Sequence, residues 1–168
     1  ERYPFWRTEN YLVSFYGRLN YSFDSRYLLT FSLRDDGSSR FSPDTRWGLF
    51  PSAAVAWNVK QEHFLKDVSF LSALKFRGSW GQTGQQEIGD NYPYLASYSL
   101  STDVYHRYNM GNGSYAFTLA PGAYDPDIKW ETTTTYNAGL DFGFASDRIT
   151  GSVDVYRRDT KDLLNTVL

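Results

Sequence analysis

The chain has 168 residues, a formal net charge of −2 and no cysteine. This length corresponds to roughly one domain. A net charge of −2 gives no electrostatic reason to expect nucleic-acid binding, for which a basic stripe would be needed. The lack of cysteine excludes disulfides and thiolate metal sites. Aromatic residues make up 18% of the chain, and they favour strands and membrane–water interfaces. No stretch approaches the ~18 consecutive apolar residues of a membrane-spanning helix.

The first two elements form a hairpin of alternating polarity. Between residues 11 and 23 the odd positions are mostly apolar and the even positions mostly polar, which predicts a strand with two different faces. Asp24-Ser25 is a short turn, and residues 26–34 repeat the alternation with a matching apolar face. The stretch from Asp35 to Ser39 breaks the pattern and predicts the start of a loop.

Two further strands are expected at residues 47–60 and 74–80. Pro51 lies inside the first of these, and because proline donates no hydrogen bond we expect a bulge or a late strand start there. Residues 61–69 form a connection. The glycine-rich run from Gly78 to Gly84 lacks the lysine of a phosphate-binding loop, so it is interpreted as a strand end turning into a loop.

Residues 85–129 show no sustained period and are rich in Gly, Asn, Ser and Tyr. A loop of this length is uncommon in a compact domain and usually indicates function. The clearest hairpin follows, with strands at 135–144 and 149–156 joined by a turn at 145–148. Residues 160–164 are weakly patterned.

The connections alternate between short and long, which is typical of outer-membrane barrels. The strands reach the ~9–11 residues that cross a bilayer when tilted, whereas strands of soluble proteins have about 5–6. One face carries aliphatic and aromatic residues. The other carries charged ones: Arg18, Arg26, Arg34, Lys75, Arg77 and Asp141. The predicted fold is therefore all-β, with about six antiparallel transmembrane β-barrel strands. A soluble β-sandwich is the alternative, since it also alternates in polarity.

Six strands are too few for a closed barrel, because single-chain bacterial barrels begin at about eight. Unpaired backbone groups at an open edge cost several kcal/mol each in hydrocarbon. Further strands of the same polypeptide are expected to cover both edges. The first residues also lack the apolar segment of a signal peptide, so we expect that Glu1 is not the true start.

Several segments resemble the SusC/RagA-type TonB-linked outer-membrane transporters. They are residues 46–52 (RWGLFPS), 56–59 (AWNV), 74–84 (LKFRGSWGQTG), 127–134 (DIKWETTT), 136–141 (YNAGLD) and 151–164. They cover most of the chain in the family's order, and they accommodate Pro51.

The resemblance implies a fragment of a barrel of about 22 strands with a plug in its lumen. It also implies import of oligosaccharide or peptide nutrients with energy from TonB, and a SusD-like surface lipoprotein as partner. Residues 1–168 are expected to be an internal part of one barrel domain in contact with outer-membrane lipid, without plug, signal peptide or the terminal aromatic of such barrels. TonB would contact parts outside this chain. A passive porin segment and a soluble carbohydrate-binding module with aromatic loops are the competing hypotheses.

No catalytic constellation is visible, so the chain is not expected to be an enzyme, to bind a cofactor or metal, or to bind nucleic acid. His63 and His106 are the only histidines. Ligand contacts are expected in the long loop, where tyrosines alternate with charged residues. The candidates are Tyr92, Tyr94, Asp103, Tyr105, Arg107 and Tyr108. They could stack on sugar rings or dock a lid protein, or they could serve only loop packing and an interfacial aromatic girdle.

Four tryptophans are predicted to be anchors at the membrane interface: Trp47, Trp57, Trp80 and Trp130. The charged face is predicted to line a wet lumen. Leu140→Arg on the lipid face should therefore lower the free energy of unfolding by about 2–4 kcal/mol, and Asn137→Arg on the lumen face should lower it clearly less.

Overall fold

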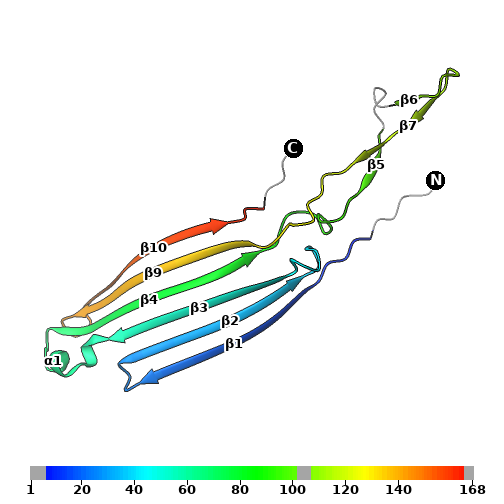
Figure 1. Cartoon of the computed structure of the whole chain (residues 1–168). Helices are drawn as coiled ribbons and strands as arrows, with labels where there is room; N and C mark the ends of the chain where they lie inside the picture. Colours follow the sequence, from blue (N-terminus) through cyan, green and yellow to red (C-terminus); the bar gives the residue numbers. More distant parts are fainter. Residues whose placement is uncertain (1–6, 102–106, 165–168) are drawn as a thin grey trace.

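We analysed a computed structural model of the chain, which describes residues 7–101 and 107–164. Six long strands form one antiparallel sheet in the order β1-β2-β3-β4-β9-β10 (Figure 1). Their bounds are β1 Leu12–Phe23, β2 Tyr27–Ser38, β3 Trp47–Asn58, β4 Leu71–Gln85, β9 Glu131–Phe144 and β10 Ile149–Lys161. The predicted all-β fold and the six predicted strands are confirmed.

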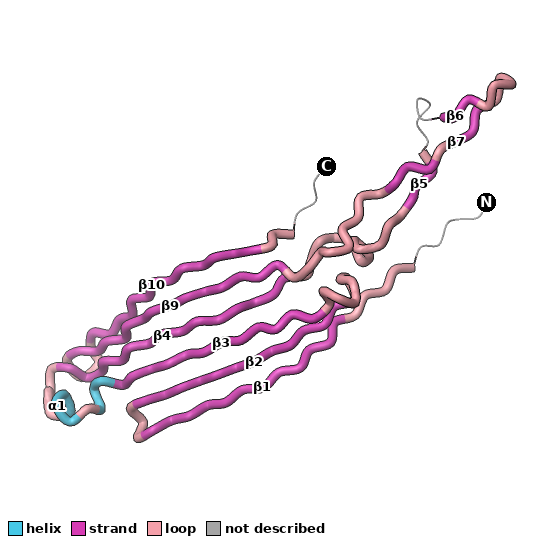
Figure 2. The backbone as a smooth tube through the Cα atoms, viewed as in Figure 1, coloured by secondary structure: helices cyan, strands magenta, loops and turns pink. Residues whose placement is uncertain are grey.

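The short connections all lie at one end of the sheet (Figure 2). β1 and β2 are joined through Asp24 and Ser25, and β9 and β10 through residues 145–148. Both turns contain residues with positive φ, which small polar residues tolerate best. The β3–β4 connection holds a 3₁₀ turn, η1 (Val59–Gln61), and one turn of helix, α1 (His63–Lys66). None of the helices in the described ranges has the length and apolarity needed to cross a membrane.

The pairing register gives the sheet two different faces, because directly opposed residues on neighbouring strands share a face. One row on the apolar face runs across all six strands and consists of Phe23, Tyr27, Trp57, Phe76, Leu140 and Val153. Its first four rings stack in sequence, with centroids 6.5, 6.5 and 6.2 Å apart. A row on the opposite face consists of Arg18, Ser32, Ser52, Gly81, Thr135 and Arg158.

Several strand ends differ from the predictions. β3 ends at Asn58 rather than residue 60, and β4 begins at Leu71 rather than residue 74. The last hairpin is longer than predicted, because β9 begins at Glu131 and β10 ends at Lys161. β2 continues through Asp35–Ser38, which were expected to begin a loop. β4 continues to Gln85, so Gly81–Gly84 lie in the strand. Pro51 causes no bulge, since β2 pairs with β3 in unbroken register, but the pairing of β3 with β4 begins only at Ser52. Because β3 itself begins at Trp47, the expected bulge or late strand start at Pro51 is wrong.

A small buried cluster fills the space where β3 and β4 separate at the long-loop end. Phe41, Phe50 and Trp130 are its members, with ring centroids 5.2 and 5.4 Å from Trp130 to the two phenylalanines. Trp130 is only 6% exposed and donates its indole N–H to the Arg46 carbonyl at 2.9 Å. The prediction that Trp130 anchors the membrane interface is wrong, because its ring is enclosed by protein.

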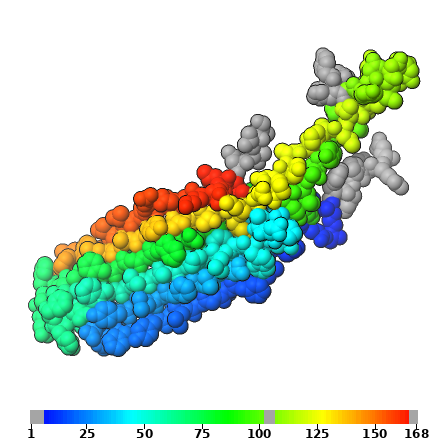
Figure 3. All heavy atoms as spheres, viewed as in Figure 1, coloured from blue at the N-terminus to red at the C-terminus, as the bar shows by residue number. Residues whose placement is uncertain are grey.

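The loop between β4 and β9 projects beyond the sheet as an arm (Figures 1 and 3). Its described residues are 86–101 and 107–130. It contains two short ribbons, β5 (Tyr98–Leu100) paired with β8 (Leu119–Pro121) and β6 (Arg107–Asn109) paired with β7 (Tyr115–Phe117). The sequence had indicated no regular structure there.

Candidate functional site

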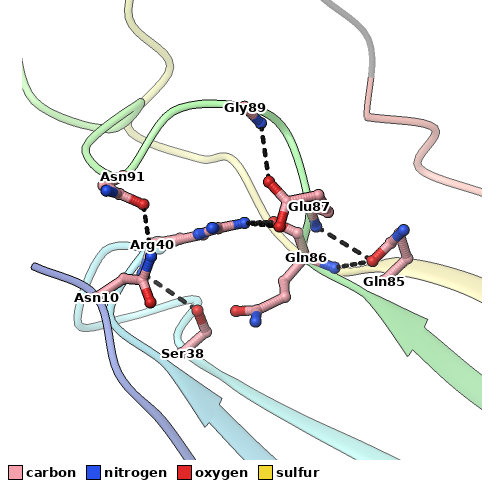
Figure 4. A network of polar contacts seen from close by, with 8 residues as sticks. All are labelled: Asn10, Ser38, Arg40, Gln85, Gln86, Glu87, Gly89 and Asn91. Atoms are coloured by element: carbon pink, nitrogen blue, oxygen red, sulfur yellow. Dashed lines mark hydrogen bonds and ion pairs between the residues drawn. The ribbon is translucent and has the colours of Figure 1, made fainter.

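The base of the arm is fastened to the β2–β3 loop by Arg40 (Figure 4). The Arg40 guanidinium lies 2.7 Å from the Glu87 carboxylate and donates to the Gln86 carbonyl at 3.3 Å. Arg40 itself is 9% exposed. The hydrogen bond from Arg40, followed by one from the Gly89 backbone, lowers the pKa of the Glu87 carboxyl. The ion pair therefore persists at neutral pH and holds two loops together.

A second contact fastens the arm to the segment that precedes β1. The Asn10 amide donates to the Asn91 side-chain oxygen at 2.8 Å (Figure 4). The Tyr92 hydroxyl donates to the Glu9 carbonyl at 3.0 Å and accepts from the Glu9 N–H at 3.3 Å. Tyr92 thus has a positioning role in the arm, which the sequence did not indicate.

The four predicted contact residues that the structure describes do not lie together. Tyr92 and half-buried Tyr94 lie at the base of the arm, whereas Arg107 and Tyr108 lie in β6 near its far end (Figure 1). The Arg107 guanidinium is 4.7 Å from the centre of the Phe117 ring, and Tyr108 is exposed. Asp103 and Tyr105 lie outside the described residues.

The β5–β8 ribbon has an apolar face. Its register places Tyr98 and Leu100 on the same side as Leu119 and Pro121, with Ser99 and Ala120 on the other side. Tyr98, Leu100 and Leu119 are 57–67% exposed. These exposed apolar side chains make the face a candidate for contact with another molecule. The sequence does not indicate this face, because strands of three residues are too short to show a period.

The polar face of the sheet carries an ion-pair network near the short-turn end. Arg77 binds both carboxylate oxygens of Asp141 at 2.9 Å and also contacts Asp154 at 3.2 Å. A side chain at Gly139 would lie 2.5 Å from Asp154 and 2.9 Å from Arg77, so glycine leaves the room that the network needs. These charges lie on the face predicted to be polar.

Glu62 ties the short-turn connections to the stacked aromatic row. Its carboxylate accepts from the Tyr27 hydroxyl at 2.7 Å, the Trp57 indole at 3.0 Å and Arg26 at 3.1 Å. The hydrogen bonds from Trp57 and then Tyr27 lower the pKa of Glu62, although its burial opposes them. Both rings point their polar tips past the edge of the apolar band, as anchors at a membrane interface do.

Within residues 7–101 and 107–164, no three His, Asp or Glu side chains gather in a way that could hold a metal ion. His63 begins α1 in the β3–β4 connection, and His106 lies outside the described residues.

The family model for the TonB-dependent receptor-like β-barrel matches residues 1–168. The chain belongs to this family. It is 57% identical over 160 residues to the TonB-dependent receptor SusC of Bacteroides thetaiotaomicron, covering 95% of this chain and 16% of SusC. It is 38% identical over 160 residues to the TonB-dependent receptor P39 of Formosa agariphila, covering 95% of this chain and 14% of that protein.

Solved structures give the same result. The chain superposes on the RagAB peptide transporter with a TM-score of 0.76 and 32% identity, covering 94% of this chain and 16% of the matched chain. The RagAB peptide importer in its closed-closed state gives the same TM-score and identity. The chain thus spans about one sixth of the length of these relatives, as a segment of an outer-membrane β-barrel wall.

This family membership orients the sheet. Outer-membrane barrels have short periplasmic turns and long extracellular loops. The end that carries α1 is therefore periplasmic, and the arm lies on the extracellular side. The apolar face contacts lipid and the face with Arg77 contacts the lumen. The soluble sandwich is not favoured, because the described long strands form one sheet with no second sheet packed on it.

Proposed function

We propose that this chain forms part of the wall of a TonB-dependent importer of oligosaccharide or peptide nutrients. The observation that supports the proposal is the family match over the whole chain. One similar solved structure, RagAB, is a peptide transporter. Energy from TonB would enter through parts of the protein outside this chain, and a SusD-like lipoprotein would be the partner at the cell surface.

A growth experiment tests import. The gene encoding the full transporter is deleted, and the strain is grown on single oligosaccharides or peptide mixtures as the limiting nutrient. We expect growth on one nutrient class to fail and to be restored by the intact gene, but not in a strain that lacks TonB. Restored growth without TonB would indicate a passive porin instead.

We infer that the arm contacts the lipoprotein partner through the apolar face of the β5–β8 ribbon. A flat ribbon suits a protein surface better than a small ligand, because ligand sites are concave. Fully buried interface positions are depleted in charge and enriched in aromatic residues, as this face is. The predicted contact residues of the long loop remain candidates for partner or substrate contact: Tyr92, Tyr94, Asp103, Tyr105, Arg107 and Tyr108.

Two substitutions on opposite sides of the ribbon test this contact. Leu119→Asp places a charge on the apolar face, and Ser99→Asp places the same charge on the other face. In the purified full-length complex, Leu119→Asp should weaken lipoprotein binding at least about tenfold, because a buried unpaired charge is costly. Ser99→Asp should change the affinity about twofold at most. Equal affinities for the two variants would rule out this face as the contact.

A further inference from the structure

The lumen face of β1 and β2 borders a hollow of about 560 Å³. Its polar lining includes Tyr16, Arg18, Ser32, Arg34, Asp36 and Thr83. The hollow lies toward the extracellular ends of these strands, below the β2–β3 loop. A volume of this size is within the range of about 300–1,000 Å³ seen for ligand pockets.

Two of these side chains have polar groups without a hydrogen-bond partner among the described residues. Tyr16 is 82% exposed, and its hydroxyl has no hydrogen-bond partner within the described residues. Arg18 donates through Nε to the Ser32 hydroxyl at 3.1 Å, which fixes the plane of the guanidinium. Its two terminal nitrogens have no partner in the part of the chain that the structure describes.

The charges around the hollow do not cancel. Arg34 is neutralised by Asp36, with Nε 2.7 Å from the carboxylate, and it also donates to the Ser14 hydroxyl at 3.3 Å. Arg77, farther along the same face, is neutralised by Asp141 and Asp154. Arg18 has no such carboxylate among the described residues. Among the described residues that line the hollow, Arg18 is therefore the basic side chain that can pair with one further negative group.

We propose that this hollow binds a carboxylate group of the transported substrate. The terminal nitrogens of Arg18 form a planar pair of donors that matches the two oxygens of a carboxylate. Directly opposite Arg34 in the register, Tyr16 offers a hydroxyl donor and a flat ring for the part of the substrate next to the carboxylate. The inference rests on the proposed import function and adds to it that the substrate is acidic.

A binding experiment on the full-length transporter in lipid nanodiscs tests the inference. Three probes are titrated by calorimetry: trigalacturonate, the acidic peptide triglutamate and neutral maltotriose. We expect one acidic probe to bind more tightly than maltotriose, and its identity separates an acidic sugar from an acidic peptide. Arg18→Gln should weaken that binding at least about tenfold, because a charge-assisted hydrogen bond is lost.

Arg158 provides the matched control. It occupies the same row of the same face as Arg18, five strands away, and does not line the hollow. Arg158→Gln should leave the affinity within about twofold of the unsubstituted protein, because a charge at that distance is largely screened. Tyr16→Phe keeps the ring and should weaken binding less than Arg18→Gln does.

Three results would overturn the inference. The first is that neither acidic probe binds more tightly than maltotriose. The second is that Arg18→Gln and Arg158→Gln change the affinity equally. The third is that Arg18→Gln lowers the melting temperature of the ligand-free transporter without changing probe affinity, which would assign Arg18 to an ion pair with another part of the polypeptide. TonB-dependent growth is measured in parallel. If growth on the nutrient depends on the transporter and on TonB but the acidic probes fail to bind, this inference alone is rejected. If the deletion strain grows as well as the strain with the intact gene, the import function is rejected.

Discussion

Glu62 is a single carboxylate that holds three donors from β2, β3 and the preceding turn. We predict that Glu62→Gln lowers the melting temperature of the full-length protein at pH 7, because the amide keeps the shape but loses the charge that pairs with Arg26. The lowered pKa of the folded carboxyl has a consequence for pH dependence. Its stabilisation is complete above the unfolded value of about 4.3 and is lost as the pH falls through the lower folded value.

Thermal unfolding at several pH values measures this effect. The difference between the unsubstituted protein and Glu62→Gln should be largest near neutral pH and should shrink below about pH 4. Glu9→Gln is the control. Among the described residues the exposed Glu9 carboxylate forms an ion pair with exposed Arg7, and the Glu9 contacts with Tyr92 use its backbone, so this substitution should be nearly neutral. If the difference in melting temperature between the unsubstituted protein and Glu62→Gln stayed constant from pH 7 to pH 3, the role assigned to Glu62 would be contradicted.

Gly84 illustrates a residue whose reason is visible only in three dimensions. A Cβ at Gly84 would lie 2.1 Å from Cζ of Phe50, whereas one at Gly78 in the same strand would meet only Val55 at 3.5 Å. We predict that Gly84→Ala costs about 1–3 kcal/mol through overpacking of the cluster. Gly78→Ala should be neutral or slightly stabilising, since alanine restricts the unfolded chain. Chemical denaturation of both variants gives the comparison, and equal stabilities would show that Phe50 can move at no cost.

At the scale of the strand, side-chain direction decides the cost of a charge. Leu140 lies on the lipid face between Phe76 and Val153, and Asn137 lies on the lumen face between Ser79 and Tyr156. We predict that Leu140→Arg costs about 2–4 kcal/mol and Asn137→Arg clearly less, because a charge on the lipid face must leave water. Reversible unfolding of the full-length barrel measures both costs. A cost for Asn137→Arg as large as that for Leu140→Arg would refute the assignment of faces.

The strands could be predicted from the sequence because each of their two faces meets a different solvent. Lipid selects apolar residues and the lumen tolerates polar ones, so the period of two is strong from residue 11 to residue 34 and again from 135 to 156. The strand ends could not be predicted in the same way. Asp36 and Ser38 are buried because the following loop folds over them, and only the fold shows that.

The candidate site was less accessible to sequence reasoning than the strands were. Ligand contact by the long segment stays a prediction, and the contacts that position this segment come from residues far apart in the chain, such as Arg40 with Glu87 and Asn10 with Asn91. Trp130 resembled the interfacial tryptophans in composition, yet Phe41 and Phe50 enclose it. A pattern of residue types does not report which loops meet.

For the whole molecule, the sheet is one layer that separates two environments. The outer edges of β1 and β10 have no strand partner within the described residues. Backbone groups exposed to hydrocarbon cost several kcal/mol each, so other strands of the full-length protein should pair with both edges. This is consistent with the chain's share of about one sixth of its relatives. The lumen-facing charges then line the interior of the barrel, and the arm projects beyond the extracellular end of the sheet.

The position of each tryptophan relative to this wall can be measured. Trp57 and Trp80 lie on the lipid face, whereas Trp130 lies in the protein cluster. Bromine atoms on lipid acyl chains quench only the tryptophans they contact. In the full-length protein in brominated lipid, Trp57→Phe or Trp80→Phe should reduce the quenchable fraction of tryptophan fluorescence, because each removes an emitter in contact with lipid. Trp130→Phe should leave that fraction unchanged or raise it, since the emission it removes is shielded. If Trp130→Phe reduced it as much as Trp80→Phe does, the cluster would have to face the bilayer, and the orientation of the wall would be wrong.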